Sequence, residues 1–239
     1  MTRSTRPPVS NEFDVLVFAK TAGYRHASIP DGIAGVERLG AEHHFGVTAT
    51  SDADAFARNH LERYAVVIWL STSGTVLGAE QRAAFENYIR GGGGYVGVHA
   101  AADTEYEWSW YGGLVGAYFY DHPSIQRATV EVAGSGSPAT AGLPAFWTRT
   151  DEWYNYRSQP RENVRVLARV NESTYDPVGS RGGRMGADHP IAWCQMYDGG
   201  RSFYTGMGHT ADSYREPLFL QHLLGGIQMV AGTARLDCR

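Results

Sequence analysis

Residues 91–104 read GGGGYVGVHAAADT, and this stretch decides how we expect the chain to fold. The four glycines end a preceding helix, and YVGVH (95–99) is typical of a strand covered on both faces. Gly97 and Ala101, two residues before and two after His99, are small enough for the tight strand-to-helix turn called a nucleophile elbow. Such a turn lifts its apex residue, His99, out of the sheet. A histidine there can act as a general base, a proton donor or a metal ligand, but it is a poor nucleophile of the Ser/Cys type.

Apolar runs alternate with helical patterns on both sides of this stretch. In the first half, strands are expected at 13–18, 47–50, 64–70 and 95–99, and helices at 29–41 and 78–90. In the second half, strands are expected at 129–132, 164–170, 191–197 and 201–205, a closing helix at 217–230, and loops at 133–145 and 173–188. Residues 104–123 are too irregular for one element, and Asp198-Gly199-Gly200 predicts a hairpin turn. The alternation predicts a doubly wound α/β fold with a mostly parallel sheet.

Length and composition indicate an ordinary globular protein. The chain has 239 residues, a net charge of −4, 43% apolar and 19% charged residues. We expect one domain over residues 13–232, between a disordered lead at 1–12 and a C-terminal tail at 233–239.

The acidic balance argues against a nucleic-acid partner, because phosphate binding needs a basic face. No apolar run approaches the roughly 20 residues of a membrane span, and the N-terminus lacks an apolar signal core, so we expect a cytoplasmic protein without a membrane partner.

The two cysteines, Cys194 and Cys238, make no disulfide framework and no CxxC metal clip. Cys194 stands in an apolar strand-like run, where we expect it to be inert core. Cys238 is the last residue but one and is expected to be exposed.

Three expected strand ends are followed by a histidine: His26, His99 and His209. Ligands of doubly wound sheets bind at the carboxyl ends of the strands, so these histidines are candidate catalytic residues at one edge. Asp103 would lie on the same face as His99 if a helix starts at the elbow, although a carboxylate at a helix entry is an equally good explanation. Two or three of the histidines could instead hold a divalent metal ion, because imidazole suits Zn, Mn, Fe or Ni.

Candidates for substrate binding are aromatic, acidic or imidazole side chains of the loops: Tyr24, Trp108, His122, Asp151, Glu152 and Tyr154. Carboxylates accept hydrogen bonds from hydroxyl groups, and flat rings cover the apolar face of a sugar, so the DEWYNY segment suits a polyol. For any one of these residues, a hydrophobic cluster in a loop is an equally good explanation.

Six motifs follow one another along the chain: VLVFAKTAGYRHASI, VVIWLSTSG, GGGGYVGVHAAADT, DEWYNY, HPIAWCQMYDGGRSFYTGMGHT and PLFLQHLLGGIQ. In this combination the chain resembles the ThuA-like (trehalose utilisation) family over about residues 13–232. The resemblance implies the class I glutamine amidotransferase-like fold, a flavodoxin-like three-layer α/β/α sandwich. It also implies a setting in carbohydrate utilisation, often alongside sugar oxidoreductases that make keto-sugars.

The resemblance also shows where this chain departs from class I amidotransferases. Those enzymes carry a cysteine at the elbow and a later His-x-Glu pair. Here the elbow residue is His99, and Thr210 and Ala211 follow His209. Glutaminase activity is therefore excluded on the sequence.

Two functions remain open. The first is an enzyme acting on a sugar or keto-sugar derivative by hydrolysis, elimination or isomerisation, with His99 as central acid/base or metal ligand. The second is a non-catalytic sugar-binding or regulatory domain that kept the pocket and lost the chemistry. A purely structural module is less favoured, because it needs no histidines at strand ends. The expected partner is a small-molecule sugar or keto-sugar, and a homodimer is a common default for an α/β protein of this size.

Overall fold

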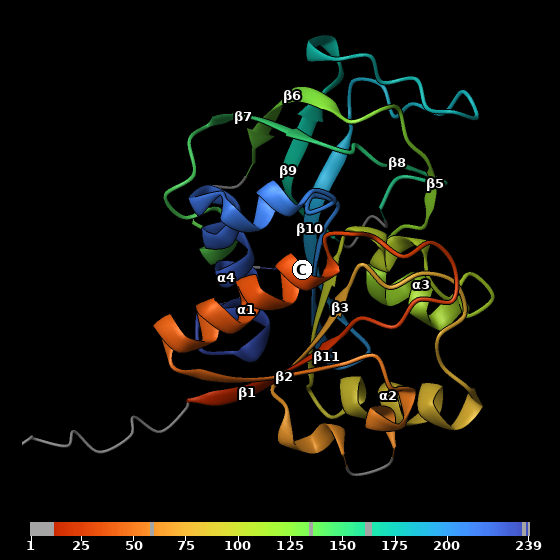
Figure 1. The fold of residues 1–239 in the computed structure, drawn as a ribbon, viewed down its shortest axis with the longest axis vertical. Helices are drawn as coiled ribbons and strands as arrows, with labels where there is room; N and C mark the ends of the chain where they lie inside the picture. Colours follow the sequence, from red (N-terminus) through yellow and green to blue (C-terminus); the bar gives the residue numbers. More distant parts are fainter. Residues whose placement is uncertain (1–11, 58–59, 134–135, 161–163, 236–237, 239) are drawn as a thin grey trace, which may run out of the picture.

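A nine-stranded sheet with the order β2-β1-β3-β4-β11-β10-β9-β6-β7 forms the centre of the computed structural model (Figure 1). The model describes residues 12–57, 60–133, 136–160, 164–235 and 238. The strands of this sheet are β1 (Phe13–Phe18), β2 (Phe45–Thr50), β3 (Val66–Leu70), β4 (Gly94–Val98), β6 (Gln126–Val132), β7 (Phe146–Asp151), β9 (Arg165–Asn171), β10 (Pro190–Tyr197) and β11 (Gly200–Thr205). A second, two-stranded sheet consists of β5 (Phe119–Asp121) and β8 (Asn155–Tyr156). The helices are α1 (Ile29–His43), α2 (Ala79–Arg90), α3 (Ser109–Val115) and α4 (Pro217–Ala231).

The large sheet has two halves of different character. From β2 to β11, every neighbouring pair of strands is parallel. From β11 to β7, every neighbouring pair is antiparallel, so that β10 and β6 run against all the other strands. The predicted mostly parallel sheet is confirmed, and the antiparallel half extends it.

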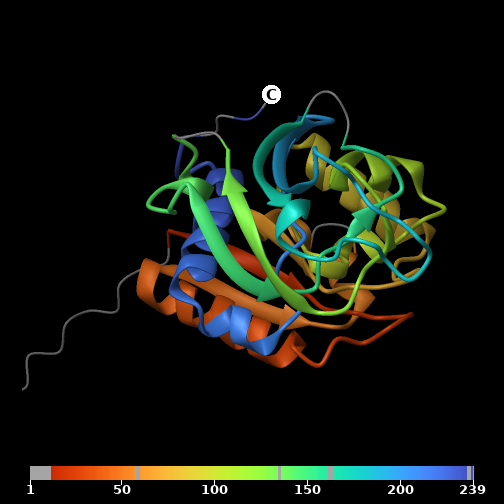
Figure 2. The same cartoon turned by 90° about the horizontal axis from the view of Figure 1, so that it is seen from above.

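Helices cover both faces of the parallel half, which gives the predicted three-layer sandwich (Figures 1 and 2). Side chains of β1 alternate between two apolar clusters, as the pleat of a strand requires. Val15 and Val17 join the cluster that includes residues of α1 and α4. Leu16 and Phe18 join the cluster that includes residues of α2 and α3. Because both faces of these strands are buried, their sequences read as continuous apolar runs.

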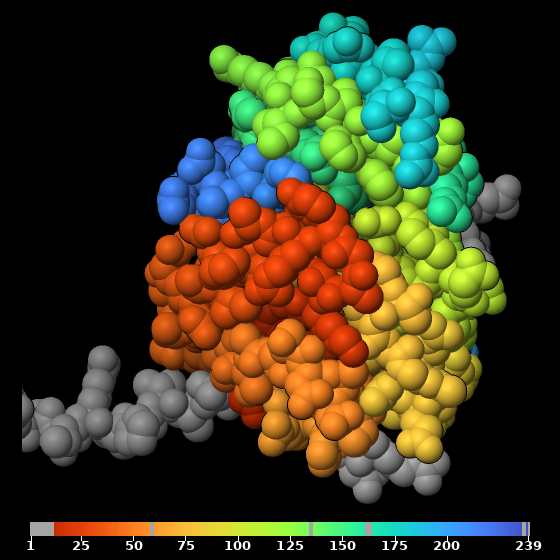
Figure 3. All heavy atoms as spheres, turned by 45° about the vertical axis from the view of Figure 1, so that its right-hand side comes forward, coloured from red at the N-terminus to blue at the C-terminus, as the bar shows by residue number. Residues whose placement is uncertain are grey.

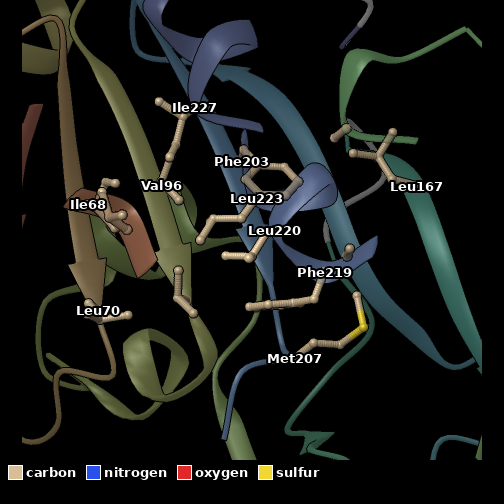
Figure 4. Close-up of a cluster of buried hydrophobic side chains, with 14 of the residues drawn as sticks. Ile68, Leu70, Val96, Leu167, Phe203, Met207, Phe219, Leu220, Leu223 and Ile227 are labelled. Carbon is tan, nitrogen blue, oxygen red and sulfur yellow. The ribbon is translucent and has the colours of Figure 1, made fainter. Parts of the chain in front are cut away.

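The core beneath α4 shows how the closing helix is fixed to the sheet (Figure 4). Leu223 and Ile227 of α4 lie against Val96 of β4 and Phe203 of β11. Gly226 is required in this helix, because a Cβ at this position would lie 2.3 Å from the Phe203 ring. The predicted helix at 217–230 therefore covers the face of the sheet that β4 and β11 form.

Several predicted elements differ from the structure. The strand β7 and the short strand β8 were not predicted, and residues 104–123 contain α3 and β5. The pattern of β7 hides it, because its inward positions hold Trp147, Arg149 and Asp151 rather than three apolar residues. A buried ion pair between the last two replaces the apolar contact that a strand pattern would show.

Cys194 lies in the core as expected, but the expectations of no disulfide and of an exposed Cys238 are wrong. Cys194 in β10 and Cys238 form a disulfide with Cα atoms 5.5 Å apart. The tail after α4 brings Cys238 back to the core, where its sulfur contacts Met229. Neither the long sequence separation nor the terminal position of Cys238 signals this return.

The segments that meet in space come from distant parts of the chain, as the space-filling view shows for one face (Figure 3). N-terminal segments (red) border C-terminal segments (blue) and the green middle of the chain there. In the described part of the chain, no helix is both long and apolar enough to cross a membrane. The expected lead at 1–12 lies outside the described residues except for Glu12, as does part of the tail at 233–239.

Candidate active site

His99 stands at the apex of the turn between β4 and a short 3-10 helix, His99–Asp103. Its backbone has a φ of 51°, a left-handed conformation that is rare for a residue with a side chain. Gly97 permits the tight packing before the turn, because a Cβ there would lie 2.5 Å from the Tyr95 hydroxyl. Ser71, directly after β3, also has a positive φ of 46°. Strained residues at adjacent strand ends are typical of functional sites.

Two contacts fix the His99 ring, whose residue is fully buried. Its Nδ1 lies 2.9 Å from the carbonyl oxygen of Gly206, so Nδ1–H donates to that oxygen. The ring packs on Tyr154 with centroids 4.1 Å apart. The hydrogen bond to Gly206 leaves Nε2 with a free lone pair, directed at the other members of the group.

His209 and Glu152 meet His99 at this nitrogen. Nε2 of His99 lies 3.0 Å from Nδ1 of His209 and 3.4 Å from Oε2 of Glu152. The same carboxylate oxygen lies 3.1 Å from Nδ1 of His209. Its other oxygen lies 3.2 Å from Nδ1 of His122. Three side chains that each offer a ligand atom therefore converge within ordinary contact distance of one another.

The charges of this group perturb its pKa values. Burial by itself raises the pKa of Glu152, but hydrogen bonds with His209 and His99 outweigh it and hold the pKa well below its usual range. Burial by itself lowers the pKa of His209, yet the hydrogen bond and the charge of Glu152 raise it above the usual value. A carboxylate that is strongly favoured in its charged form is therefore present at the centre of the group.

His26 completes the group from the loop after β1. Its residue is only 4% exposed, and its ring lies edge-on to those of His99 and His209, with centroids 4.8 and 5.0 Å away. Burial, and then the neighbouring histidines, lower its pKa from 6.5 to about 3. Its Nδ1 is buried and has no hydrogen-bond partner among the described residues. Ligand atoms of His26, His99, Glu152 and His209 all lie within 4.8 Å of one another. We call these four residues the His/Glu cluster.

Asp151 holds His209 in place rather than facing the cluster. Its carboxylate accepts hydrogen bonds from the backbone N–H groups of Gly208 and His209, at 2.8 and 3.1 Å. It also pairs with Arg149 at 2.6 Å and is fully buried. We expected this carboxylate to bind substrate hydroxyls, but the structure gives it these other partners. The buried pair acts as the support of the Gly208–His209 backbone.

The other predicted residues take different places. Tyr24 is 66% exposed and lies edge-on to His26, with centroids 4.9 Å apart. Asp103 accepts a hydrogen bond from the Tyr106 hydroxyl at 2.6 Å, and burial raises its pKa. Trp108 is not brought to the cluster, because it packs in the core beside α2 and donates to Glu86.

A cavity of about 410 Å³ is lined by Tyr120, Tyr156, Arg157, Arg181, Gly183 and Arg184. Its wall is linked to the site through Tyr106, because the Arg157 guanidinium lies 4.0 Å from the centre of that ring. The Tyr106 hydroxyl in turn donates to Asp103, at the end of the 3-10 helix that His99 begins. Sequence reasoning missed Tyr106 and Arg157, since neither follows a predicted strand or stands in one of the six motifs, and the strand before Arg157, β8, was itself not predicted.

The fold and the site together define an amidotransferase-like α/β protein with histidine at the elbow; both cysteines of the chain are engaged in the disulfide. The sequence profile of the ThuA family, described as trehalose utilisation, matches residues 14–230, and the chain belongs to this family. The family suggests a carbohydrate-related role.

Solved structures agree with this assignment. A putative ThuA-like protein from Bacteroides uniformis has a TM-score of 0.80 and 24% identity, covering 99% of this chain and 98% of that one. A putative ThuA-like protein from Parabacteroides merdae has a TM-score of 0.76 and 17% identity, covering 95% and 92%. A protein of Salmonella typhimurium described as cytoplasmic has a TM-score of 0.62 and 11% identity, covering 90% and 98%. No curated protein has a matching sequence. At these identities the likeness shows the fold, as the resemblance of the motifs implied.

Proposed function

We propose that this chain is an enzyme of carbohydrate utilisation that acts on a sugar or keto-sugar derivative by hydrolysis, elimination or isomerisation. The observation that carries the proposal is the convergence of the largely buried His/Glu cluster on one edge of the sheet, around the strained His99. Family membership supplies the carbohydrate setting. A purely structural domain gains nothing from gathering two buried histidines, a partly exposed one and a buried carboxylate, because the buried groups lose their hydration.

His99 is the central group of the proposed chemistry. Because Nδ1–H donates to the Gly206 carbonyl, Nε2 is the ring atom that can accept a proton from the substrate or bind a metal ion. A keto-sugar suits such a site, because removal of a proton beside a carbonyl needs one well-placed base and a group that stabilises the enolate. His209, held by Asp151, is in position to supply the second function.

Sugar recognition is assigned to the groups around the cluster. Tyr24 and the half-exposed His122 border the cluster at the surface, whereas Tyr154 forms its buried floor. The cavity with Tyr120, Arg157 and Arg181 offers further donors to hydroxyl groups.

A turnover assay tests this proposal. Sugars and keto-glycosides are screened with the wild-type protein, with His99→Gln and with His43→Gln, a control that removes an exposed histidine at the end of α1. We expect turnover by the wild type and the control, and a loss of at least about 10²-fold in His99→Gln, as for removal of a general acid/base. Sugar binding without turnover by any of the three proteins would contradict the proposal and support the non-catalytic sugar-binding domain.

A further inference from the structure

We propose that the His/Glu cluster is a metal centre in which His26, His99, Glu152 and His209 bind one divalent transition-metal ion. The inference deepens the proposed function and rests on it only for the chemistry that the metal would serve. The site itself is argued from geometry, from the support of each ligand and from the types of donor atom.

The distances between donor atoms fit a common ion. Metal–ligand distances of about 2.0–2.1 Å in a tetrahedral site place the ligand atoms roughly 3.3–3.4 Å apart. The three measured separations among His99 Nε2, His209 Nδ1 and Glu152 Oε2 are 3.0, 3.4 and 3.1 Å. His26 contributes a ligand atom within 4.8 Å of all of these. One ion can therefore contact all four residues after small adjustments of side chains.

Three of the four ligands have the outer support that metal sites use. The Nδ1–H group of His99 donates to the Gly206 carbonyl, which fixes the ring and leaves Nε2 for the ion. His122 contacts the second oxygen of Glu152 at 3.2 Å. Asp151 holds the backbone of His209 by accepting its N–H group. Such partners orient the ligands and raise their affinity for the ion.

A hydrogen-bonded cluster without a cation explains the arrangement less well. His26 is buried against two other imidazoles, and its Nδ1 has no hydrogen-bond partner among the described residues. An isolated polar group of this kind costs free energy unless another partner satisfies it. A cation among the four residues gives the converging lone pairs a common partner, and one negative charge from Glu152 balances it in part.

The donor set selects the class of ion. Three imidazoles and one carboxylate suit Zn, Mn, Fe, Co or Ni, whereas Mg and Ca prefer sites made of oxygen. When bound, such an ion supplies Lewis acidity that polarises a carbonyl or hydroxyl oxygen of the substrate. His122 and Tyr24 remain beside it as groups that orient the sugar.

Zn(II) affinity tests the centre without any substrate. Tag-free protein is stripped with a chelator, dialysed, and titrated with Zn(II) against a chromophoric competitor, with His43→Gln as control and His26→Gln, Glu152→Gln and His209→Gln as ligand variants. We expect one Zn(II) per chain for wild type and control, and affinity at least about 100-fold weaker in each ligand variant, since loss of outer-shell partners alone costs 10–100-fold. Far-UV circular dichroism checks that each variant is folded.

A second measurement covers variants that fail to fold. Wild-type protein loaded with Co(II) is expected to show the visible d–d bands of a four- or five-coordinate site, and Zn(II) should abolish them by displacement. Zn(II) affinity no tighter than millimolar, or the same affinity in wild type and folded ligand variants, would overturn the metal centre.

The outcomes for the metal centre and for the enzyme are separate. Tight Zn(II) binding with no turnover of any sugar would contradict the proposed function and leave the metal centre. Turnover of a sugar by a protein that shows no specific Zn(II) binding would overturn the metal centre and leave the proposed function.

Discussion

The parallel and antiparallel halves of the sheet make unequal contributions to the site. The parallel half supplies His26, His99 and His209 from the ends of β1, β4 and β11. The antiparallel half supplies Glu152, directly after its outermost strand β7. The parallel, doubly wound half thus positions the three histidines. The carboxylate of Glu152, which contacts His99 and His209, comes from the antiparallel extension of the sheet.

The difference shows how the two halves are coupled. Asp151 at the end of β7 holds the Gly208–His209 backbone after β11, and Glu152 contacts both His99 and His209. The antiparallel half therefore positions the parallel half's last histidine as well as adding its own carboxylate. Damage to either half should impair the same site.

The largest expected effect follows from removing the only charge that the antiparallel half contributes to the cluster. Glu152→Gln keeps the shape of the side chain but loses the carboxylate beside His99 and His209. We expect kcat/KM to fall by about 10²–10³-fold, similar to the loss in His99→Gln, because both act in one unit. Steady-state kinetics of the single and double variants measure this. A double variant whose loss equals the product of the two single losses would contradict the common unit.

Breaking the support between the halves is expected to have the next largest effect. Arg149→Met leaves Asp151 buried without its cationic partner, and Arg149 also pairs with Glu216 of the α4 N-cap. We expect the free energy of unfolding to fall by about 3 kcal/mol or more, as for other broken buried pairs. Denaturant unfolding measures it.

A more exposed ion pair of the antiparallel half provides the control for this variant. Arg169 on β9 pairs with the exposed Asp188, so Arg169→Met should cost no more than about 1 kcal/mol. If both variants lose the same free energy of unfolding, the buried Arg149–Asp151 pair stabilises the protein no more than an exposed pair does.

The smallest expected effect is a pH dependence at the junction of the halves. His222 of α4 lies between Phe203 of β11 and Trp147 of β7, and its Nδ1–H donates to the Ala139 carbonyl. Burial lowers its pKa from 6.5 to about 4. The folded state therefore resists protonation, and the stability that the neutral ring supports is present above pH 6.5 and lost as the pH falls towards 4. The loss is at most about 3 kcal/mol, from 1.36 kcal/mol per pKa unit.

Comparison with His222→Asn isolates this contribution. The variant keeps a donor for Ala139 but has no group that titrates. We expect the difference in unfolding free energy between wild type and variant to shrink as the pH falls from 6.5 to 4. A difference that stays constant over this range would show that His222 does not titrate on unfolding.

The sequence predicts the parallel half far better than the antiparallel half. A strand buried on both faces, such as β3, reads as an unbroken apolar run, and the small residues around His99 indicate the elbow. In β7, the inward Arg149 and Asp151 satisfy each other, so the polar pair hides the strand until its partners are known. The disulfide between Cys194 and Cys238 depends on the path of the chain after α4, which no local pattern encodes.

The same distinction applies to the site. The strand-end rule places the three histidines together, since parallel strands end at one edge. The sequence predicts Glu152 only as a candidate carboxylate for substrate hydroxyls, and its contact with His99 requires the antiparallel half to fold back. Tyr106 and Gly206 contact site residues through a hydroxyl and a backbone carbonyl, which carry no sequence signal of their own.

Anomalous diffraction from crystals grown with Zn(II) tests the central claim most directly, that ligands from both halves of the sheet form one centre. The account predicts a single strong peak at the carboxyl ends of β4 and β11, with His26, His99, Glu152 and His209 about 2.0–2.2 Å from it. A peak bound by histidines alone, with Glu152 turned away, or no peak at this place, would contradict it.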